Sequence, residues 1–437
     1  MDQLIEALRH RAGLLQCPRP DQFEFAYRFE EFLAGCHLAN RNVWTGDDAN
    51  FLHRARALLR EQGDYARKVV QWAAGVFAHV NPDQSAVKDL VAALTPATPT
   101  TESLPDLMLA AEIAKDARMA GWQDDDVPYT GKTLTDLRER LDTVSRATDA
   151  FPVKARAAAA SARGWLGELP AGVGLGKDGL PDLEWCSLPA GEFKLGETKR
   201  RVKVPAFQIS RYPVTVAQYE AFLKDPEGYH DRQWWEDGRD APGMLQWWKH
   251  NHEQGPENYD PVFQTPNHPR VGVCWYEAVA FCRWLSARKG LDPDDPKAIR
   301  LPREAEWEWA ARWNKKSGQA DKGDYPWGGS VNDPDVKEKL SRHCNWSGTG
   351  LGHTSAVGLF PKGKADCGAL DLSGNVWEWC GDWYDQGRHT RVVRGGSWVG
   401  GISEDLSVSC RSDDGPDYRH LLNGFRCVVV GGVAAAG

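Results

Sequence analysis

The sequence predicts a protein in two parts, an all-α N-terminal part followed by an α+β part that is rich in loops. Up to about Glu168, apolar residues recur at three- and four-residue spacing, which is typical of amphipathic helices. After a glycine-rich stretch at 171–182 this periodicity is rare, and Gly, Pro, Asn and Asp interrupt short segments. Of the 20 tryptophans, those that precede this stretch are Trp44, Trp72, Trp122 and Trp165. We therefore expect the second part to have few long elements and a core of large aromatic side chains.

These differences divide the chain into a helical N-terminal domain (1–168), a linker (169–182) and a second domain (183–437). Within the N-terminal domain we expect helices at 2–15, 21–39, 66–80 and 134–147. The domain contains no catalytic motif, so we interpret it as a helical bundle that contacts a partner of unknown identity. The linker has the glycine content of a phosphate-binding loop but lacks the flanking strand and helix that a phosphate cradle needs.

In the second domain, two stretches carry the start and stop signals of helices. The stretch 215–225 begins at Thr215 and has Gln218 three residues later, which together form a capping box. The stretch 274–290 places apolar residues on one stripe and ends at Gly290, a favourable residue at a helix end. Strand-like runs lie at 202–210, 269–275 and 374–379.

Composition excludes several classes of function. The 437 residues are 41% hydrophobic and 26% charged with a net charge of −8, so the chain lacks the basic balance of a nucleic-acid-binding protein. Its apolar runs are shorter than the roughly 20 residues that a membrane span requires. The charged stretch 1–17 lacks the apolar core of a signal peptide, and we expect a cytoplasmic protein. The ten cysteines include no CxxC pair and the 12 histidines no HExxH motif, so no zinc site is indicated.

Eight stretches, taken in order, resemble the formylglycine-generating enzyme (sulfatase-modifying factor) domain, a branch of the C-type lectin fold. They are 188–196, 209–223, 268–286, 299–312, 325–329, 370–384, 391–398 and 423–427, and include LDLSGNVWEWCGDWY, RVVRGGSW and NGFRC. The resemblance covers about residues 183–430. It implies an α+β fold with a small twisted antiparallel sheet, two helices and long ordered loops.

The resemblance does not extend to the catalytic residues of the family's enzymes. The copper-dependent oxidases carry two cysteines shortly after the RGGS sequence, and thiolates are the ligands that copper(I) requires. The equivalent stretch here, 397–405, contains no cysteine. A divergent oxidase that uses Cys410 with Cys427 or Cys274 remains the alternative to a non-catalytic protein.

A second alternative is an iron-dependent sulfoxide synthase of the ergothioneine type, which also has a helical domain before this fold. The resemblance implies that such an enzyme holds its iron with a lone histidine and an HxxxH pair. The histidines of the helical part are His10, His37, His53 and His79, and no two of them are four residues apart.

The family resemblance also raises the question of a metal. Asn375 and Glu378 lie where some relatives bind calcium, an ion that prefers oxygen ligands. Acidic ligands for a second calcium ion are not evident around Asn345. We therefore favour structural hydrogen bonding by Asn375 and Glu378, with calcium at these residues as the alternative, and no cofactor is required.

The C-terminal segment has definite ends and an irregular middle. We interpret five residues as the scaffold of a binding site, held by internal ion pairs and packing: Arg394, Trp398, Arg411, Arg419 and Arg426. Between them, apolar, aromatic, acidic and imidazole side chains follow no burial pattern, as expected of a recognition surface on a fixed scaffold. These candidate ligand-binding residues are Val399, Gly400, Ile402, Ser412, Asp413, Tyr418, His420, Leu421 and Leu422. A solvated loop without a ligand is the alternative.

This arrangement resembles the variable proteins of diversity-generating retroelements, in which an RGGSW…R…P…R…GFR frame holds diversified residues. Asparagine codons mutated at adenines can encode every one of the nine candidates, whereas Glu404 lies outside that set. The resemblance implies a non-catalytic protein whose C-terminal surface, residues 399–422, binds a protein or another macromolecule. We expect no catalytic residue, no nucleic-acid partner and no membrane span.

Overall fold

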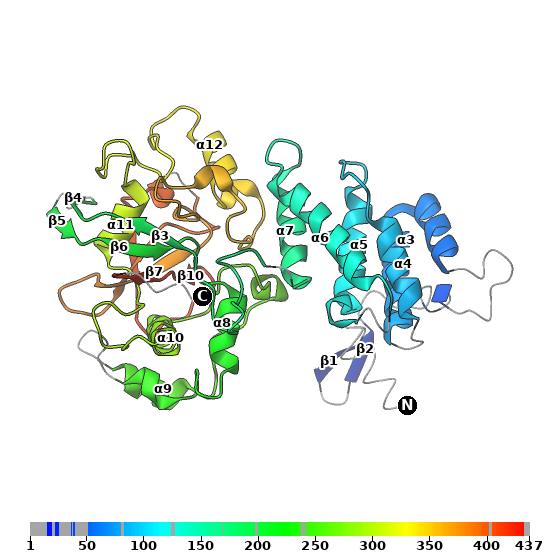
Figure 1. The fold of residues 1–437 in the computed structure, drawn as a ribbon, viewed down its shortest axis with the longest axis horizontal. Helices are drawn as coiled ribbons and strands as arrows, with labels where there is room; N and C mark the ends of the chain where they lie inside the picture. Colours follow the sequence, from blue (N-terminus) through cyan, green and yellow to red (C-terminus); the bar gives the residue numbers. More distant parts are fainter. Residues whose placement is uncertain are drawn as a thin grey trace. The chain divides into compact units, whose positions relative to one another are not determined.

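The computed structural model describes residues 15–19, 22–25, 36, 38–39, 51–79, 83–123, 127–167, 169–196, 200–236, 241, 243–401 and 404–431, apart from the side chains of 61–65. The chain forms two compact units, residues 1–144 and 145–437 (Figure 1). Within the described residues, no helix combines the length and the apolar character that crossing a membrane requires.

The first unit is mainly helical, as the apolar spacing predicts. Its elements are α3 (Phe51–His79), α4 (Gln84–Leu94), α5 (Leu104–Asp116), η4 (Met119–Gly121) and α6 (Thr130–Arg146). Helices α3, α4 and α5 pack against one another and bury an apolar face on each. Phe51 and Phe77, near the two ends of α3, are both buried and their ring centroids lie 4.6 Å apart, so α3 does not run straight between them. The expected helices at 66–80 and 134–147 are therefore present, within α3 and α6.

A β-hairpin replaces part of one expected helix. Strand β2 (Gln22–Phe25) pairs antiparallel with β1 (Leu15–Arg19), so the prediction of a helix from residue 21 is wrong over these residues. The physical reason is the pairing with β1, which supplies hydrogen-bond partners that the spacing of apolar residues within 21–39 does not reveal. The expected helix at 2–15 and most of 21–39 lie outside the described residues.

The second unit contains three small sheets (Figure 1). Their strands are β3 (Trp185–Leu188), β4 (Gly191–Leu195), β5 (Arg200–Val204), β6 (Phe207–Ser210), β7 (Trp377–Trp383), β8 (Arg391–Arg394), β9 (Arg411–Asp414), β10 (Asn423–Gly424) and β11 (Val428–Val429). The largest sheet has the order β10-β7-β8-β9, with a parallel β10–β7 pair and antiparallel pairs elsewhere. The others have the orders β11-β6-β3 and β4-β5. Strand β9 thus lies at an edge of the sheet that carries the C-terminal segment.

Helices and single turns surround these sheets. They are α7 (Val153–Trp165), α8 (Val216–Lys224), η5 (Arg232–Trp235), α9 (Met244–Asn251), η6 (Pro261–Gln264), α10 (Trp275–Arg288), α11 (Glu304–Arg312), α12 (Val336–His343), η7 (Ser347–Thr349), η8 (Pro361–Gly363) and η9 (Glu404–Leu406). The two helices expected from the sequence are α8 and α10. The capping box of α8 is present, since the Thr215 hydroxyl accepts from the Gln218 amide while the Gln218 side chain accepts from the Thr215 amide. The strand-like run at 269–275 forms a single bridge, between Pro269 and Thr215, because α10 begins at Trp275.

The core of the second unit is aromatic, as the distribution of tryptophan predicts. Between α8 and α10, the rings of Tyr219 and Phe281 stack with centroids 5.5 Å apart. Phe425, from the C-terminal frame, meets Phe281 edge-to-face at 5.4 Å. Aromatic pairs in such geometries contribute about 0.5–1.5 kcal/mol beyond the burial of their surface. The C-terminal frame is therefore built into the centre of the unit.

Helix α7 belongs to this second unit, although it lies within the range expected for the N-terminal domain. Its buried Ala157 and Ala160 pack against Ala356, Leu359 and Phe360. Polar contacts add to this packing. The Asn267 amide donates to the Ala160 carbonyl at 2.8 Å, and the Ser161 hydroxyl lies 2.8 Å from Nε2 of His268.

His268 gives this contact a predicted pH dependence. Burial, with a smaller effect of His353, lowers the pKa of His268 to about 3, so the folded protein keeps the ring neutral. The unfolded chain binds a proton near pH 6.5, and stability from this group is present above that pH and lost as pH falls toward 3. The expected slope is at most about 1.4 kcal/mol per pH unit. Denaturant unfolding between pH 4.5 and 7 measures it.

The matched variants separate His268 from other titrating groups. His268→Gln is expected to flatten the slope, whereas His230→Gln, at an exposed position, leaves it unchanged. Asp371 acts in the opposite sense, because burial raises its pKa to about 6 and its contribution falls as pH rises from about 4 to 6. The difference between the pH slopes of the wild type and of His268→Gln gives the contribution of His268 to the free energy of unfolding. Equal slopes would show that His268 does not cause the pH dependence.

Candidate ligand-binding surface

Two scaffold arginines meet one carboxylate pair on α11. Arg394, fully buried on β8, donates to Glu304 at 2.9 Å and to Glu308 at 2.6 Å. Arg411, on the neighbouring strand β9, donates to the same Glu304 at 2.8 Å. Because both guanidinium groups share one helix, the start of the RGGSW sequence and the start of β9 are held in fixed relative positions.

The other two arginines hold the end of the segment. Arg426 forms two bonds with Glu378, of 2.6 and 2.7 Å, and also donates to the carbonyls of Ser210 and Leu370. Arg419 forms two bonds with Glu277, the third residue of α10, at 3.0 and 2.8 Å. Although burial disfavours a charged group, Glu277 holds the pKa of Arg419 above its usual value.

The irregular stretch between these arginines has a fixed backbone. The loop 415–422 is closed at its base by a 2.6 Å hydrogen bond from Asn423 to Asp414. Three backbone amides from two other segments then donate to loop carbonyls: Gly272 to His420, Tyr276 to Pro416 and Trp377 to Leu422. A loop held from several elements keeps one shape, so its side chains are presented in constant positions.

The structure places the candidate ligand-binding residues unequally. Val399 and Tyr418 are 42% and 49% exposed. Ser412 and Asp413 are half-buried on edge strand β9, and His420, Leu421 and Leu422 are half-buried in the loop. Gly400 is buried, and Ile402 lies outside the described residues. The ring of Tyr418 stacks on His420 with centroids 5.5 Å apart.

Between the two exposed ends lies an aromatic strip, which we define as Tyr418, Tyr259, Phe263 and Trp398. Of these, Phe263 is buried, while Tyr259 and Trp398 are half-buried. Tyr259 lies 6.2 Å from Phe263, and Phe263 lies 5.9 Å from Trp398 between ring centroids. Tyr418 is close enough to Tyr259 to help raise its pKa, after burial and the hydrogen bond to Glu257. Leu421 and Trp398 both pack on the small core beneath the strip.

Sequence reasoning missed Tyr259 and Phe263. They lie on and beside η6, in a loop without period, and only the long-range contacts of the fold bring them to the C-terminal segment. Arg270 fixes that loop, since it donates to Gln264, the Glu257 carbonyl and Asn258. The sequence signal that could have identified them is the stretch ENYDPVF (257–263), in which a turn separates the two aromatic residues.

A hollow of about 260 Å³ lies at the Trp398 end of the strip. Its lining residues are Ser347, Gly350, Gly352, Trp398 and Val399. The Ser347 hydroxyl donates to the Gly400 carbonyl at 2.7 Å, which fixes one wall of the hollow against the residue after Val399.

Comparison with known proteins identifies the second unit. The family described as sulfatase-modifying factor enzyme 1-like domain matches residues 180–430. The chain belongs to this family. The resemblance drawn from the eight sequence blocks is therefore confirmed, and so is the expected fold: a C-type lectin-like α+β domain after a helical region.

The sulfatase-modifying factor family includes enzymes to which the chain is similar. It is 32% identical over 254 residues to a hercynine oxygenase of Mycolicibacterium thermoresistibile, covering 52% of this chain but only about half, 51%, of that protein. It is 30% identical over 304 residues to a formylglycine-generating enzyme of Thermomonospora curvata, covering 55% of this chain and 91% of that protein. Among solved structures, Treponema denticola variable protein 1 is similar with a TM-score of 0.40 and 22% identity, covering 56% and 94% of the two chains.

In this family member, the cysteines of the oxidase alternative occupy different surroundings. Cys410 is half-buried just before β9, and its amide donates to Ser407. Cys274 precedes α10, and Cys427 lies in the aromatic core, where its sulfur is 3.8 Å from that of Cys282. Burial raises the pKa of Cys274 well above its usual value, which disfavours the thiolate that metal binding needs.

The residues considered for calcium are engaged in hydrogen bonds. The Asn375 side-chain oxygen accepts from the Ser355 amide at 2.9 Å and from Asn345 at 3.3 Å. Both Glu378 oxygens are bound by Arg426, and one also accepts from the Trp307 indole at 2.7 Å. Calcium needs six to eight oxygen ligands, and a carboxylate already bound to a guanidinium is a poor one. In the described part of the chain, no three His, Cys, Asp or Glu side chains gather as a metal site. Calcium at this position stays a prediction.

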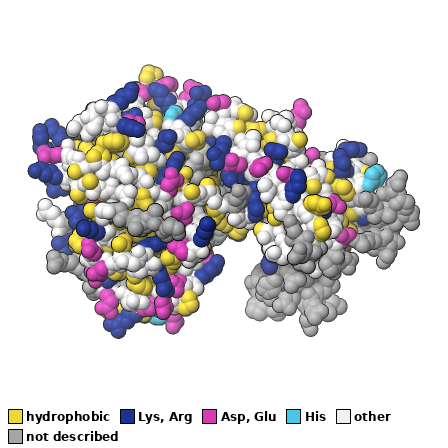
Figure 2. Space-filling view, in the orientation of Figure 1, with side chains coloured by type: hydrophobic (Ala, Val, Ile, Leu, Met, Phe, Trp, Pro, Cys, Tyr) yellow, Lys and Arg dark blue, Asp and Glu magenta, His cyan; other side chains and the backbone are white. Residues whose placement is uncertain are grey.

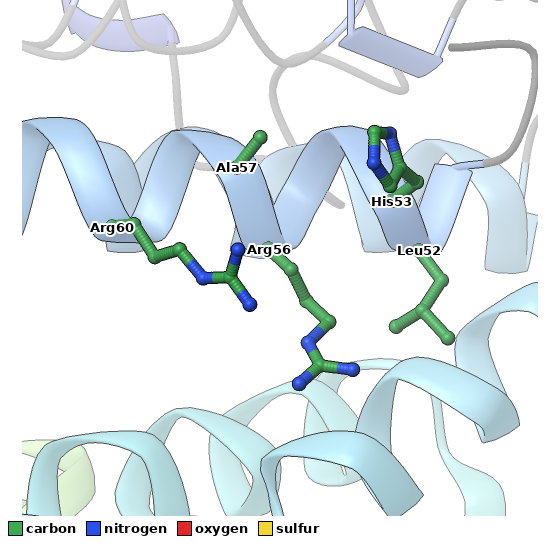
Figure 3. A pocket seen from close by; sticks show the side chains of 5 residues that line it. All are labelled: Leu52, His53, Arg56, Ala57 and Arg60. Carbon is green, nitrogen blue, oxygen red and sulfur yellow. The ribbon is translucent and has the colours of Figure 1, made fainter. Parts of the chain in front are cut away.

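The first unit has a hollow of its own, of about 210 Å³, along α3. Figure 3 shows Arg56 and Arg60 on the same side of the helix, both exposed, with Leu52. His53 and His79, two histidines of the iron-enzyme alternative, lie at opposite ends of α3. Among the described residues, neither of them belongs to a group of three His, Cys, Asp or Glu side chains that could hold a metal ion. His10 and His37 lie outside the described residues.

A basic patch covers the outer face of the β4–β5 hairpin. Lys194, Arg200, Arg201 and Lys203 are exposed there, and Figure 2 shows Lys and Arg gathered at this edge of the unit. Lys194 and Arg201 stand directly opposite each other across the strands. Arg201 also pairs with Glu192 at 3.2 Å, an exposed pair that contributes little to stability.

Proposed function

We propose that the chain is a non-catalytic binding protein whose C-terminal surface, residues 399–422 with the aromatic strip, contacts a protein ligand. The observation that carries this proposal is the pairing of a fixed backbone with exposed side chains. The loop 415–422 accepts hydrogen bonds from three backbone amides outside it, while Tyr418 and Val399 are about half exposed. A preorganised surface binds without the entropic cost of ordering a loop.

The chemistry of the surface favours a macromolecule. Tyrosine, tryptophan and phenylalanine are enriched where proteins bind proteins, because a large ring buries much area and loses little conformational entropy. Around the strip, Ser412, Asp413 and His420 supply polar groups suited to the rim of an interface. The strip extends over several segments, which suits a broad partner better than a small molecule.

The proposal includes diversification of the segment by a retroelement, since all nine candidate residues can arise from asparagine codons mutated at adenines. Sequencing the DNA around the gene tests this part. A near-copy of the 3′ coding region that differs at adenines, next to a reverse transcriptase gene, is the expected result. A neighbourhood without either would contradict diversification and leave the binding surface itself untouched.

A library of random peptides displayed on phage tests the binding surface. Peptides selected on the wild-type chain are expected to lose at least about tenfold in affinity for a variant with Tyr418, His420 and Leu421 all replaced by Ala. Leu175→Ala is the matched control, because Leu175 is 47% exposed on the same unit and lies outside the surface. Thermal melts of both variants check that Leu421, which packs on a small core, has not unfolded the unit.

Two outcomes would contradict the proposal. One is selected peptides that bind the triple variant as tightly as the wild type. The other is tight, stoichiometric copper(I) binding by the reduced protein that Cys410→Ser abolishes, which would favour the oxidase.

A further inference from the structure

The hollow beside Trp398 has the size of a single-ring pocket. Its volume is about 260 Å³, whereas an apolar cavity of about 150 Å³ is enough to hold benzene. One substituted aromatic ring therefore fits, and a folded segment does not. Its walls come from the 347–352 loop and from Trp398 and Val399.

Glycine keeps one wall of the hollow bare. Gly350 and Gly352 have φ angles of 65° and 76°, the left-handed region in which other residues are strained. A Cβ built on Gly352 would meet nothing within 4 Å, so the space there is open rather than filled by a neighbour. The flat backbone of these glycines on one side, with an indole and a valine on the other, suits the faces of a planar ring.

The exposed hydrogen-bond donor beside the pocket is the Lys154 ammonium, whereas the donor of the lining residue Trp398 is buried. Within the described residues, the buried Trp398 indole N–H has no acceptor. The Lys154 ammonium lies near Gly350, since a Cβ built on that glycine would be 3.8 Å from Nζ. The lining residues include no carboxylate. An exposed ammonium beside a pocket whose lining has no carboxylate favours a ligand group that carries an oxygen acceptor.

We propose that this pocket receives the phenol ring of a tyrosine side chain from the protein ligand, with the ring beside Trp398 and the hydroxyl oxygen near the Lys154 ammonium. The inference rests on the proposed function and adds the chemistry of one ligand residue. The aromatic strip ends at the pocket, so a ligand lying along the strip reaches the pocket with one side chain.

Small probes test the pocket on the full chain, without a known ligand. In titrations followed by saturation-transfer NMR, p-cresol is expected to bind, toluene to bind about fivefold more weakly, and acetate not to bind. Val399→Trp, at an exposed position, fills the pocket and abolishes p-cresol binding, whereas Val399→Ala retains it. Lys154→Met removes the ammonium and leaves the lining residues unchanged, so it is expected to reduce the preference for p-cresol over toluene.

The outcomes separate this inference from the proposed function. If p-cresol does not bind, or binds Val399→Trp and wild type equally, the pocket assignment is wrong even where selected peptides need Tyr418. If acetate binds and toluene does not, the pocket recognises an anion and the tyrosine assignment is wrong. Selected peptides that contain a tyrosine, and that lose affinity both when it becomes alanine and in Val399→Trp, would support the assignment.

Discussion

Replacing Arg426 by Met is expected to destabilise the second unit by about 3–5 kcal/mol, a large part of the 5–15 kcal/mol that a domain typically has. Arg426 and Glu378 are both fully buried, with two hydrogen bonds between them. Without the guanidinium, the donor that remains to the buried Glu378 carboxylate among the described residues is the Trp307 indole. The free energy of unfolding by guanidinium chloride, followed by tryptophan fluorescence, measures the loss.

The double variant Arg426→Met/Glu378→Gln identifies the cause. It removes the uncompensated charge and retains an acceptor for Trp307, so it is expected to be more stable than Arg426→Met alone. Arg201→Met is the surface control, because its pair with Glu192 is exposed and its loss changes stability by at most about 0.5 kcal/mol. A loss below about 1 kcal/mol in Arg426→Met would show that the buried pair behaves like this exposed one.

The frame of the C-terminal segment was predictable from local sequence, whereas its partners were not. RGGSW and GFR identify Arg394 and Arg426 as scaffold residues. Their carboxylates, Glu304 with Glu308 and Glu378, lie up to 90 residues away along the chain. No period or spacing links such positions, because the contact arises from the packing of α11 and β7 against the C-terminal strands.

The same limit applies to the recognition surface. Tyr418 and Val399 stand out in the sequence because they interrupt a rigid frame, and the structure places both at the surface. The backbone that supports Tyr418 is fixed by amides of Gly272, Tyr276 and Trp377, from segments that are remote in sequence. Local sequence predicted the structure best where the interacting residues lie within one helix, as in the capping box of α8. They failed at residues 22–25, where pairing with a second strand decided the outcome.

Replacing Ala157 by Asp is expected to destabilise the second unit by about 3–5 kcal/mol, whereas Ala158→Asp changes stability by at most about 0.5 kcal/mol. The two residues are neighbours on α7. Ala157 is buried in the small core with Leu359 and Phe360, whereas Ala158 is exposed. An aspartate at position 157 would place an unpaired charge in the small core with Leu359 and Phe360. The unfolding of each variant in guanidinium chloride measures the difference.

This comparison also decides to which part of the chain α7 belongs. The glycine-rich linker predicts that the second domain begins near residue 183, with α7 in the helical domain. The packing of α7 on Phe360, with Arg156 5.8 Å above that ring, makes the helix part of the lectin-like unit. If Ala157→Asp leaves the second unit as stable as Ala158→Asp does, α7 is detached from it and the division predicted from the linker holds. If only Ala157→Asp unfolds it, the lectin-like fold begins before α7, and Lys154 is a fixed part of the pocket beside Trp398.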